Sequence, residues 1–213
     1  MLNLKLLLAS ATLLFATASN ASQQVSEQVS GHVKSYTQAQ QEYIKYKNKH
    51  EKVLNNFAKI SYKNGAAYKT YIEKTAKDKN ISPDIFALAA LESGFNPKAK
   101  STTQNAGMWQ ISKAIGKEAG LKINNNIDER FEWKKSTHAA LNHIKEKNNK
   151  FKNLDLAVLS YSIGNRKIEK AIAKHNTNNT WILLSDSQIF NKRDKDYMFK
   201  YMAFKEKLKK INL

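Results

Sequence analysis

The stretch ALAALESGFNP, residues 87–97, carries a run of small apolar residues into a turn. Ser82 followed by Pro83 is typical of a helix start, because a serine side chain caps free backbone N–H groups and proline fits the first helical turn. Gly94 favours the end of that helix, and the proline that closes the stretch prevents further helical turns. We therefore expect a helix over residues 84–92 that passes directly into a loop.

Glu92 is the one carboxylate of this stretch, and it follows a predicted apolar helix face. Ile85, Leu88 and Ala89 form that face. Burial against it would disfavour the charged form of the carboxyl group and raise its pKa, so that Glu92 could act as a general acid near neutral pH. An ordinary exposed glutamate at a helix end is the alternative, and the stretch alone does not decide between the two.

Apolar residues elsewhere in the chain recur every three or four positions, as in amphipathic helices. No stretch alternates with a period of two, so we predict an all-α single domain without internal repeats. Residues 94–108 are rich in glycine, serine, threonine and asparagine, which predicts a long loop. The spacing of Val53 and Ile60 predicts helical structure over residues 53–60, and the same pattern recurs over residues 68–76. Further helices are expected over residues 109–119, over 136–147 with Ser136 as the cap, over 154–163 with Gly164 at the end, from residue 168 onward, and over 197–211.

The N-terminus has the layout of a secretory signal peptide over residues 1–21. A short positively charged start is followed by an apolar segment over residues 6–15 and by the small residues Ser19-Asn20-Ala21, where a signal peptidase would cut. The segment is short for a membrane span, and an uncleaved anchor is the alternative. Cleavage predicts a periplasmic or secreted protein. Residues 22–50 are polar, and we predict an N-terminal arm over residues 22–62 that is either helical or disordered.

The chain is strongly basic, with 36 Lys and Arg residues against 18 Asp and Glu residues and a net charge of +18. Such a charge suits nucleic acid, an anionic membrane surface or an anionic wall polymer. Only Arg130, Arg166 and Arg193 are arginines, although base readout and bidentate phosphate recognition depend on arginine. Together with the expected export, this disfavours nucleic acid and leaves wall polymers and membrane surfaces as the partners that the charge would attract.

Several motifs follow the first stretch in a fixed order. LESGFNPKAKS is followed by AGMWQIS, by GL, by DERFEWKKSTHAALNHI and by LAVLSYSIGNRKIEKAI. In this order and at these spacings, the chain resembles the lytic transglycosylase catalytic domain of glycoside hydrolase family 23, which is related to goose-type lysozyme. The resemblance is greatest to the membrane-bound lytic murein transglycosylase D subgroup and runs from about Tyr68 to Leu208. It implies a lysozyme-like helical domain with a long active-site loop, which we place at residues 63–213.

The resemblance also implies roles for individual residues. Glu92 matches the single catalytic acid of the family, and Ser93 matches a neighbour that can hydrogen-bond the substrate or that acid. Gln110 matches a residue that contacts the glycan, Tyr161 matches the tyrosine of an Ala-Tyr-Asn-x-Gly motif, and Tyr197 matches a tyrosine that projects toward the acid. The substrate implied is peptidoglycan glycan, and neither a cofactor nor a metal is expected.

The reaction implied is cleavage between N-acetylmuramic acid and N-acetylglucosamine with formation of a 1,6-anhydromuramic end. One glutamate would serve first as acid and then as base, and the N-acetyl group of the substrate would replace the second carboxylate of most glycosidases. Asp128 and Glu129 are the next acids along the chain, and we expect them to form structural ion pairs or caps instead of taking part in catalysis.

Two residues depart from the family pattern. Ser162 stands where an asparagine follows the motif tyrosine, and Ser112 stands two positions after Gln110, where an aromatic residue or methionine is usual. Serine is shorter than asparagine and lacks its amide group, so the sugar site could be altered although the acid is kept. Two alternatives therefore stay open: a goose-type lysozyme-like hydrolase that uses water, and a peptidoglycan-binding or assembly protein with weakened catalysis.

Overall fold

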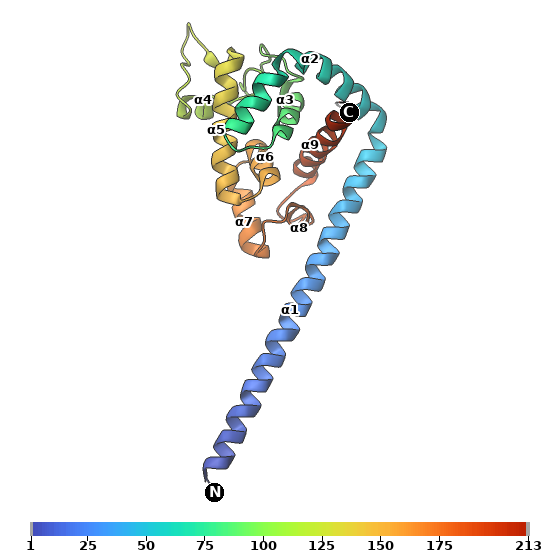
Figure 1. Cartoon of the computed structure of the whole chain (residues 1–213), viewed down its shortest axis with the longest axis vertical. Coiled ribbons are helices and arrows are strands. Elements are labelled where there is room, and N and C mark those ends of the chain that lie inside the picture. The colour runs from blue at the N-terminus through green and yellow to red at the C-terminus, as the bar shows by residue number, and fades with distance from the viewer. Residues whose placement is uncertain (1, 212–213) are drawn as a thin grey trace.

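The computed structural model describes the backbone of residues 2–211 and the side chains of residues 20–211. Within the described backbone the chain is all-α, as predicted, with three isolated β-bridges and no strand. Figure 1 shows a long N-terminal helix that runs along one side of a bundle of shorter helices. The helices are α1 (Leu2–Lys49), α2 (Glu51–Asp78), η1 (Pro83–Ile85), α3 (Phe86–Ser93), α4 (Lys113–Glu118), η2 (Glu129–Phe131), α5 (Trp133–Phe151), α6 (Leu154–Ile163), α7 (Asn165–His175), α8 (Thr180–Leu184) and α9 (Lys192–Ile211).

The signal peptide expected over residues 1–21 lies outside the described side chains, except for Asn20 and Ala21. Between residues 20 and 211, no helix combines the length and the apolar character needed to cross a membrane.

The helix predicted from the ALAALESGFNP stretch forms as expected. Ser82 caps η1 by accepting a hydrogen bond from the backbone N–H of Asp84, and Pro83 occupies the first helical position. α3 continues from η1 and ends at Gly94, which adopts a left-handed conformation with φ of 61°. Gly164 likewise ends α6, with φ of 80°. Local capping residues therefore identify these helix boundaries correctly.

Other helix boundaries differ from the prediction. Ser136 does not cap α5, because the helix begins three residues earlier and the Ser136 hydroxyl donates to the Trp133 carbonyl within it. The helix expected over residues 109–119 starts only after Ser112, whose side chain caps α4 by accepting from the backbone N–H of Ile115. Helix α8 was not predicted. It begins with an Asn179 cap, but it is too short to show a periodic pattern.

α3 occupies the centre of the bundle. It packs against α2 and α9, and its residues Phe86 to Ala90 are all buried. A helix that is apolar on every side belongs inside the protein, and its alanines let the neighbouring helices approach closely. The spacing of Val53 and Ile60 identified α2 but not its inner face, because both side chains are exposed. The inner face instead carries Leu54, Ile72 and several smaller residues.

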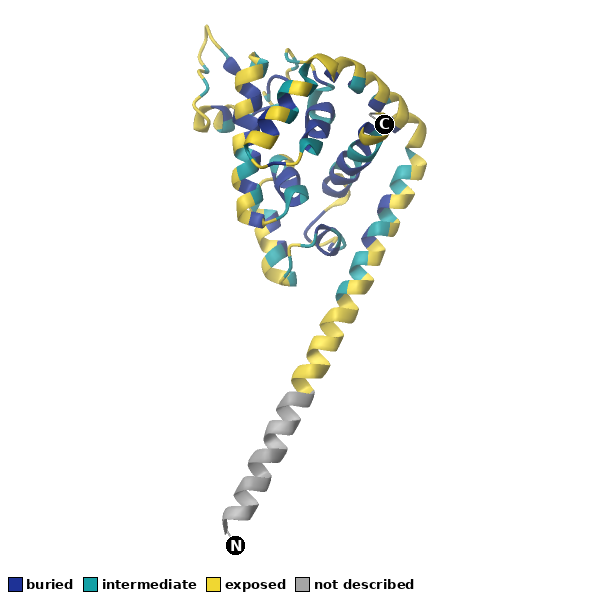
Figure 2. Ribbon diagram, in the orientation of Figure 1, coloured by how far each residue is buried: buried dark blue, intermediate teal, exposed yellow. Residues whose placement is uncertain are grey.

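α1 follows the outside of this bundle, and its second half is held by partly buried polar contacts. The Tyr43 hydroxyl donates to Glu206 of α9 at 2.6 Å, and Lys47 forms an ion pair with the same carboxylate at 3.0 Å. Lys195 of α9 forms an ion pair with Glu42 at 2.9 Å. Figure 2 shows the exposed stretch of α1 that precedes these contacts. The division of the chain near residue 62 remains a prediction, and α2 runs through that position as one continuous helix.

The loop between α3 and α4 is held by a buried arginine. Arg130 is 1 % exposed, and its guanidinium donates to the carbonyl oxygens of Gln104 and Ile111 at 2.8 and 3.0 Å. Asp128 pairs with Arg130 at 2.6 Å and caps η2 through the backbone N–H of the same residue. Glu129 pairs with Lys135 at 2.6 Å. The structural roles expected for the two acids of the DER motif are therefore confirmed.

Replacement of Gly107 by alanine should destabilise this loop strongly. A Cβ atom there would lie 1.9 Å from the carbonyl oxygen of Arg130, and the backbone φ of 79° already disfavours a side chain. We expect Gly107→Ala to lower the free energy of unfolding by about 3 kcal/mol or more, measured by urea denaturation.

Gly120→Ala is the matched control for this variant. Gly120 has nearly the same φ, 80°, but nothing lies within 4 Å of the added Cβ atom, so only backbone strain of about 1–2 kcal/mol is expected. Equal losses of unfolding free energy in the two variants would show that the close approach to Arg130 has no energetic effect.

Candidate active site

Glu92 lies in the last turn of α3, between the buried interior and the surface. Its Oε1 atom accepts a hydrogen bond from the Tyr197 hydroxyl of α9 at 2.7 Å. Burial raises the pKa of Glu92 to about 7, although the Tyr197 hydrogen bond and the positive charge of Lys200 both act to lower it. A glutamic acid in this range holds a proton near neutral pH and can also release it, as general acid–base catalysis requires.

Lys200 is a residue of this site that the sequence did not indicate. It follows Tyr197 by three positions on α9, so the two side chains lie on the same side of the helix. The Lys200 ammonium lies 5.2 Å from the centre of the Phe57 ring and 5.6 Å from that of Phe204. Burial lowers the pKa of Lys200, and the Glu92 carboxylate acts to raise it. The only signal in the sequence was this spacing from Tyr197.

Tyr161 approaches from α6. Its hydroxyl donates to the backbone carbonyl of Trp109 at 2.7 Å, which joins the helix to the long loop. Burial raises the pKa of Tyr161 far above its ordinary value, and the charge of Glu92 adds to that shift. The fold thus brings Glu92, Tyr161 and Tyr197 to one place from three helices.

The side chains of Ser93 and Gln110 both form hydrogen bonds with the backbone of the loop. The Ser93 hydroxyl donates to the Met108 carbonyl at 2.7 Å and accepts from the backbone N–H of Asn96 at 3.0 Å. The Gln110 side-chain amide donates to the Gly107 carbonyl at 2.9 Å, and its backbone has a left-handed φ of 48°.

Ser162 lies at the end of α6, and its side chain is exposed. It is the next residue after Tyr161, whose hydroxyl bonds to the loop.

Three contacts therefore fix the backbone of residues 106–111 beside Glu92. Ser93 donates to the Met108 carbonyl, Tyr161 to the Trp109 carbonyl and Arg130 to the Ile111 carbonyl. Trp109 is fully buried below them, and its indole N–H donates to the Thr137 hydroxyl at 2.9 Å. Trp109 therefore stabilises the floor of the site and does not present its ring to solvent. Between residues 20 and 211, no group of three His, Cys, Asp or Glu side chains is placed to hold a metal ion.

Comparison with known proteins identifies the domain that carries this geometry. Residues 69–184 match the model of the transglycosylase SLT domain, a segment that contains Glu92, Gln110 and Tyr161. Tyr197 and Lys200 lie beyond the end of that segment.

Two similar proteins match different shares of this chain. Membrane-bound lytic murein transglycosylase D of Escherichia coli strain K12 is 32% identical over 147 residues, which cover 67% of this chain and 31% of that protein. A putative tributyltin chloride resistance protein of Alteromonas sp. strain M-1 is 28% identical over 107 residues, which cover 50% of this chain and 52% of that protein. The chain thus spans about a third of the length of the Escherichia coli protein.

A solved structure has the same fold. An inactive mutant of the lytic transglycosylase Slt from Pseudomonas aeruginosa superimposes with a TM-score of 0.58 at 15% identity, over 68% of this chain and 24% of that chain. This confirms the lysozyme-like helical fold that the resemblance implied. Since the domain match covers more than half of the residues, the chain belongs to the transglycosylase SLT domain family.

Proposed function

We propose that this chain cleaves peptidoglycan glycan strands as a lytic transglycosylase and that Glu92 is its one acid–base group. The main support is the Glu92 carboxyl group, whose burial raises its pKa to about 7 and which is held at 2.7 Å by the Tyr197 hydroxyl. Glu92 also lies within residues 69–184, the segment that matches the SLT domain.

In the proposed reaction, protonated Glu92 donates its proton to the oxygen that bridges N-acetylmuramic acid and N-acetylglucosamine. The bond from the anomeric carbon to that oxygen then breaks, and the N-acetyl group of the muramic residue stabilises the positive charge that develops. Glu92, now a carboxylate, accepts the proton of the muramic 6-hydroxyl, whose oxygen attacks the anomeric carbon. A 1,6-anhydro ring closes and Glu92 regains its proton, so one carboxyl group serves both steps.

The neighbours of Glu92 suit both of its protonation states. Burial favours the neutral acid before bond cleavage, whereas the Tyr197 hydrogen bond and the Lys200 charge stabilise the carboxylate formed afterwards. We propose that Ser93 and Tyr161 act mainly by holding the loop that carries Gln110, because both hydroxyls already bond to loop carbonyls. Gln110 and Ser162 are proposed to contact the glycan at the edge of the site.

We further propose that the protein acts outside the cytoplasm, in the periplasm or as a secreted protein, after removal of residues 1–21. Removal of Lys5 with this segment lowers the net charge from +18 to +17, and this charge would attract anionic wall polymers and membrane surfaces and so keep the protein near the glycan.

Substitution of Glu92 by glutamine should abolish glycan cleavage while the fold is kept, because the two side chains have almost the same shape. Purified sacculi are digested with each protein and the soluble products are analysed by mass spectrometry. We expect 1,6-anhydromuropeptides from the unchanged protein and none from Glu92→Gln, with equal circular dichroism spectra and equal unfolding midpoints.

The same digest separates the alternatives. Reducing muramic ends in place of anhydro ends would identify a hydrolase. Sacculus binding without any products, unaffected by Glu92→Gln, would identify a binding or assembly protein and would contradict the proposal.

Removal of the Lys200 charge should move the pH dependence of cleavage. The reactive form of Glu92 is protonated, so activity should fall as the pH rises through about 7. Since the Lys200 charge lowers the pKa of Glu92, Lys200→Met should raise that pKa and move the midpoint of the fall to higher pH.

Lys200→Arg is the control, because it keeps the positive charge and should leave the midpoint near that of the unchanged protein. The midpoint is taken from the rate of product release across a pH series. A midpoint that stays fixed or moves to lower pH in Lys200→Met would contradict the proposed electrostatic role.

A further inference from the structure

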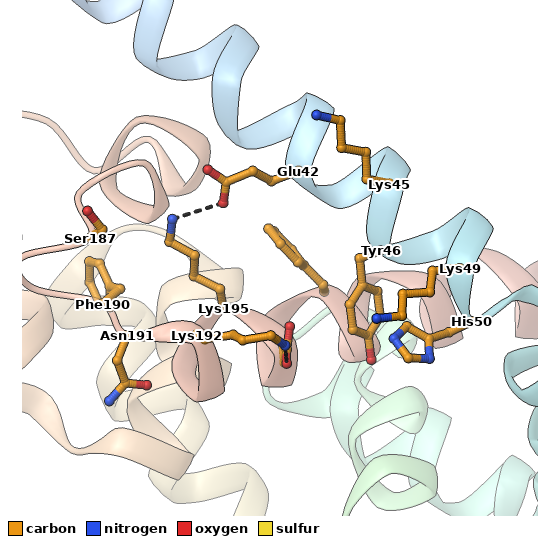
Figure 3. A pocket seen from close by; sticks show the side chains of 12 residues that line it. Glu42, Lys45, Tyr46, Lys49, His50, Ser187, Phe190, Asn191, Lys192 and Lys195 are labelled. Atoms are coloured by element: carbon orange, nitrogen blue, oxygen red, sulfur yellow. Dashed lines mark hydrogen bonds and ion pairs between the residues drawn. The ribbon is translucent and has the colours of Figure 1, made fainter.

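A cavity of about 470 Å³ lies between α1 and α9, on a different side of α9 from the candidate active site. Residues 42–49 of α1 and the following His50 form one wall, and residues 187–199 form the other (Figure 3). Each residue of an α-helix advances by about 100°, so Lys195 and Phe199 lie roughly opposite Tyr197 on α9. The cavity is therefore separate from the Glu92 site. We refer to it as the α1–α9 cavity.

Aromatic side chains line the apolar part of the α1–α9 cavity. Phe190 and Phe199 are buried, and the Tyr46 ring lies 5.8 Å from the Phe199 ring and 4.6 Å from the His50 ring. These rings line a recess whose volume falls within the range of about 300–1,000 Å³ that is typical of sites for small ligands. Such a recess suits a flat apolar group.

The charged part of the cavity has an excess of positive charge. Its two carboxylates already have partners, since Glu42 pairs with Lys195 and Asp196 pairs with Lys192. Lys45 and Lys49 line the same cavity from successive turns of α1, and no ion pair is formed by either of them with a described residue. Two lysines that form no ion pair with a described residue thus line the cavity that holds the apolar recess.

Lys195 adds hydrogen-bond donors to the positively charged part of the cavity. It is 8 % exposed, and among the described side chains its ammonium donates to Glu42 alone. An ammonium group has three donors, so further donors of Lys195 are available to an acceptor that enters the cavity. A carboxylate placed there would meet Lys195 inside and Lys45 or Lys49 at the edge.

We propose that the α1–α9 cavity binds an acidic peptide segment of a partner protein, in which an aromatic side chain fills the recess and neighbouring carboxylates pair with Lys45 and Lys49. A peptide suits the cavity better than a lipid surface, because a recess between two helices admits single side chains, whereas a membrane needs a broad exposed face. Both walls lie outside residues 69–184, the segment that matches the SLT domain. The cavity is therefore an addition to the matched domain.

The probe for this site is the peptide acetyl-Glu-Phe-Glu-amide, and the neutral acetyl-Gln-Phe-Gln-amide is its control. Binding to the whole chain is followed by NMR chemical-shift changes and by calorimetry. We expect the acidic peptide to bind with shifts confined to residues 42–50 and 187–199, and the neutral peptide to bind at least about tenfold more weakly.

The double variant Lys45→Gln/Lys49→Gln should weaken the binding of the acidic peptide at least about tenfold and leave cleavage of sacculi unchanged. Lys34→Gln/Lys77→Gln is the matched control, because it removes two exposed lysines that do not line the cavity and should leave peptide binding unchanged.

Three results would overturn the proposal. The first is equal binding of the acidic and neutral peptides. The second is an equal loss of affinity for the acidic peptide in both double variants, which would show that the net charge of the chain alone attracts the peptide. The third is the absence of peptide binding while vesicles of phosphatidylglycerol and phosphatidylcholine bind through Lys45 and Lys49, which would assign these lysines to a membrane surface.

Discussion

The hydrogen bond between Tyr197 and Glu92 is the contact on which the account of this chain depends. The carboxyl group must be buried enough for its pKa to rise to about 7 and must still meet a donor that stabilises its charged form. α3 supplies the burial because it is apolar on every side, and α9 supplies the donor. α9 is in turn held by α1 through the Glu42–Lys195 and Tyr43–Glu206 contacts, so the N-terminal arm braces the helix that completes the site.

The loop after α3 has irregular backbone that must stay fixed beside a reactive group. Buried carbonyl groups need hydrogen-bond donors, and this loop receives them from Arg130, Tyr161 and Ser93. Gly107 allows the Arg130 backbone to approach, which no residue with a side chain could do. The residues that position the site are thus more numerous than those proposed to touch the substrate.

Local signals in the sequence were sufficient for α3, because its cap at Ser82 and its end at Gly94 act within a few residues. The all-α fold and the position of Glu92 could be predicted for the same reason, with help from the family resemblance. The Tyr197–Glu92 pair joins residues 105 positions apart, so only the resemblance suggested it, and Lys200 was missed because nothing local marks its charge as near Glu92. Ser136 does not act as the expected cap because a serine hydroxyl can also bond to a carbonyl of its own helix, as Ser136 does with Trp133. The periodicity of Val53 and Ile60 did not reveal which face of α2 is buried.

The most direct test of the account is the pKa of Glu92 itself, measured by ¹³C NMR titration of the glutamate carboxyl groups in the whole chain. The Glu92 resonance is assigned by its loss in Glu92→Gln. We expect a midpoint of about 7 for this one carboxyl group. A midpoint near 4.5, the ordinary value for glutamate, would show that Glu92 is solvated and would rule out the proposed acid–base role.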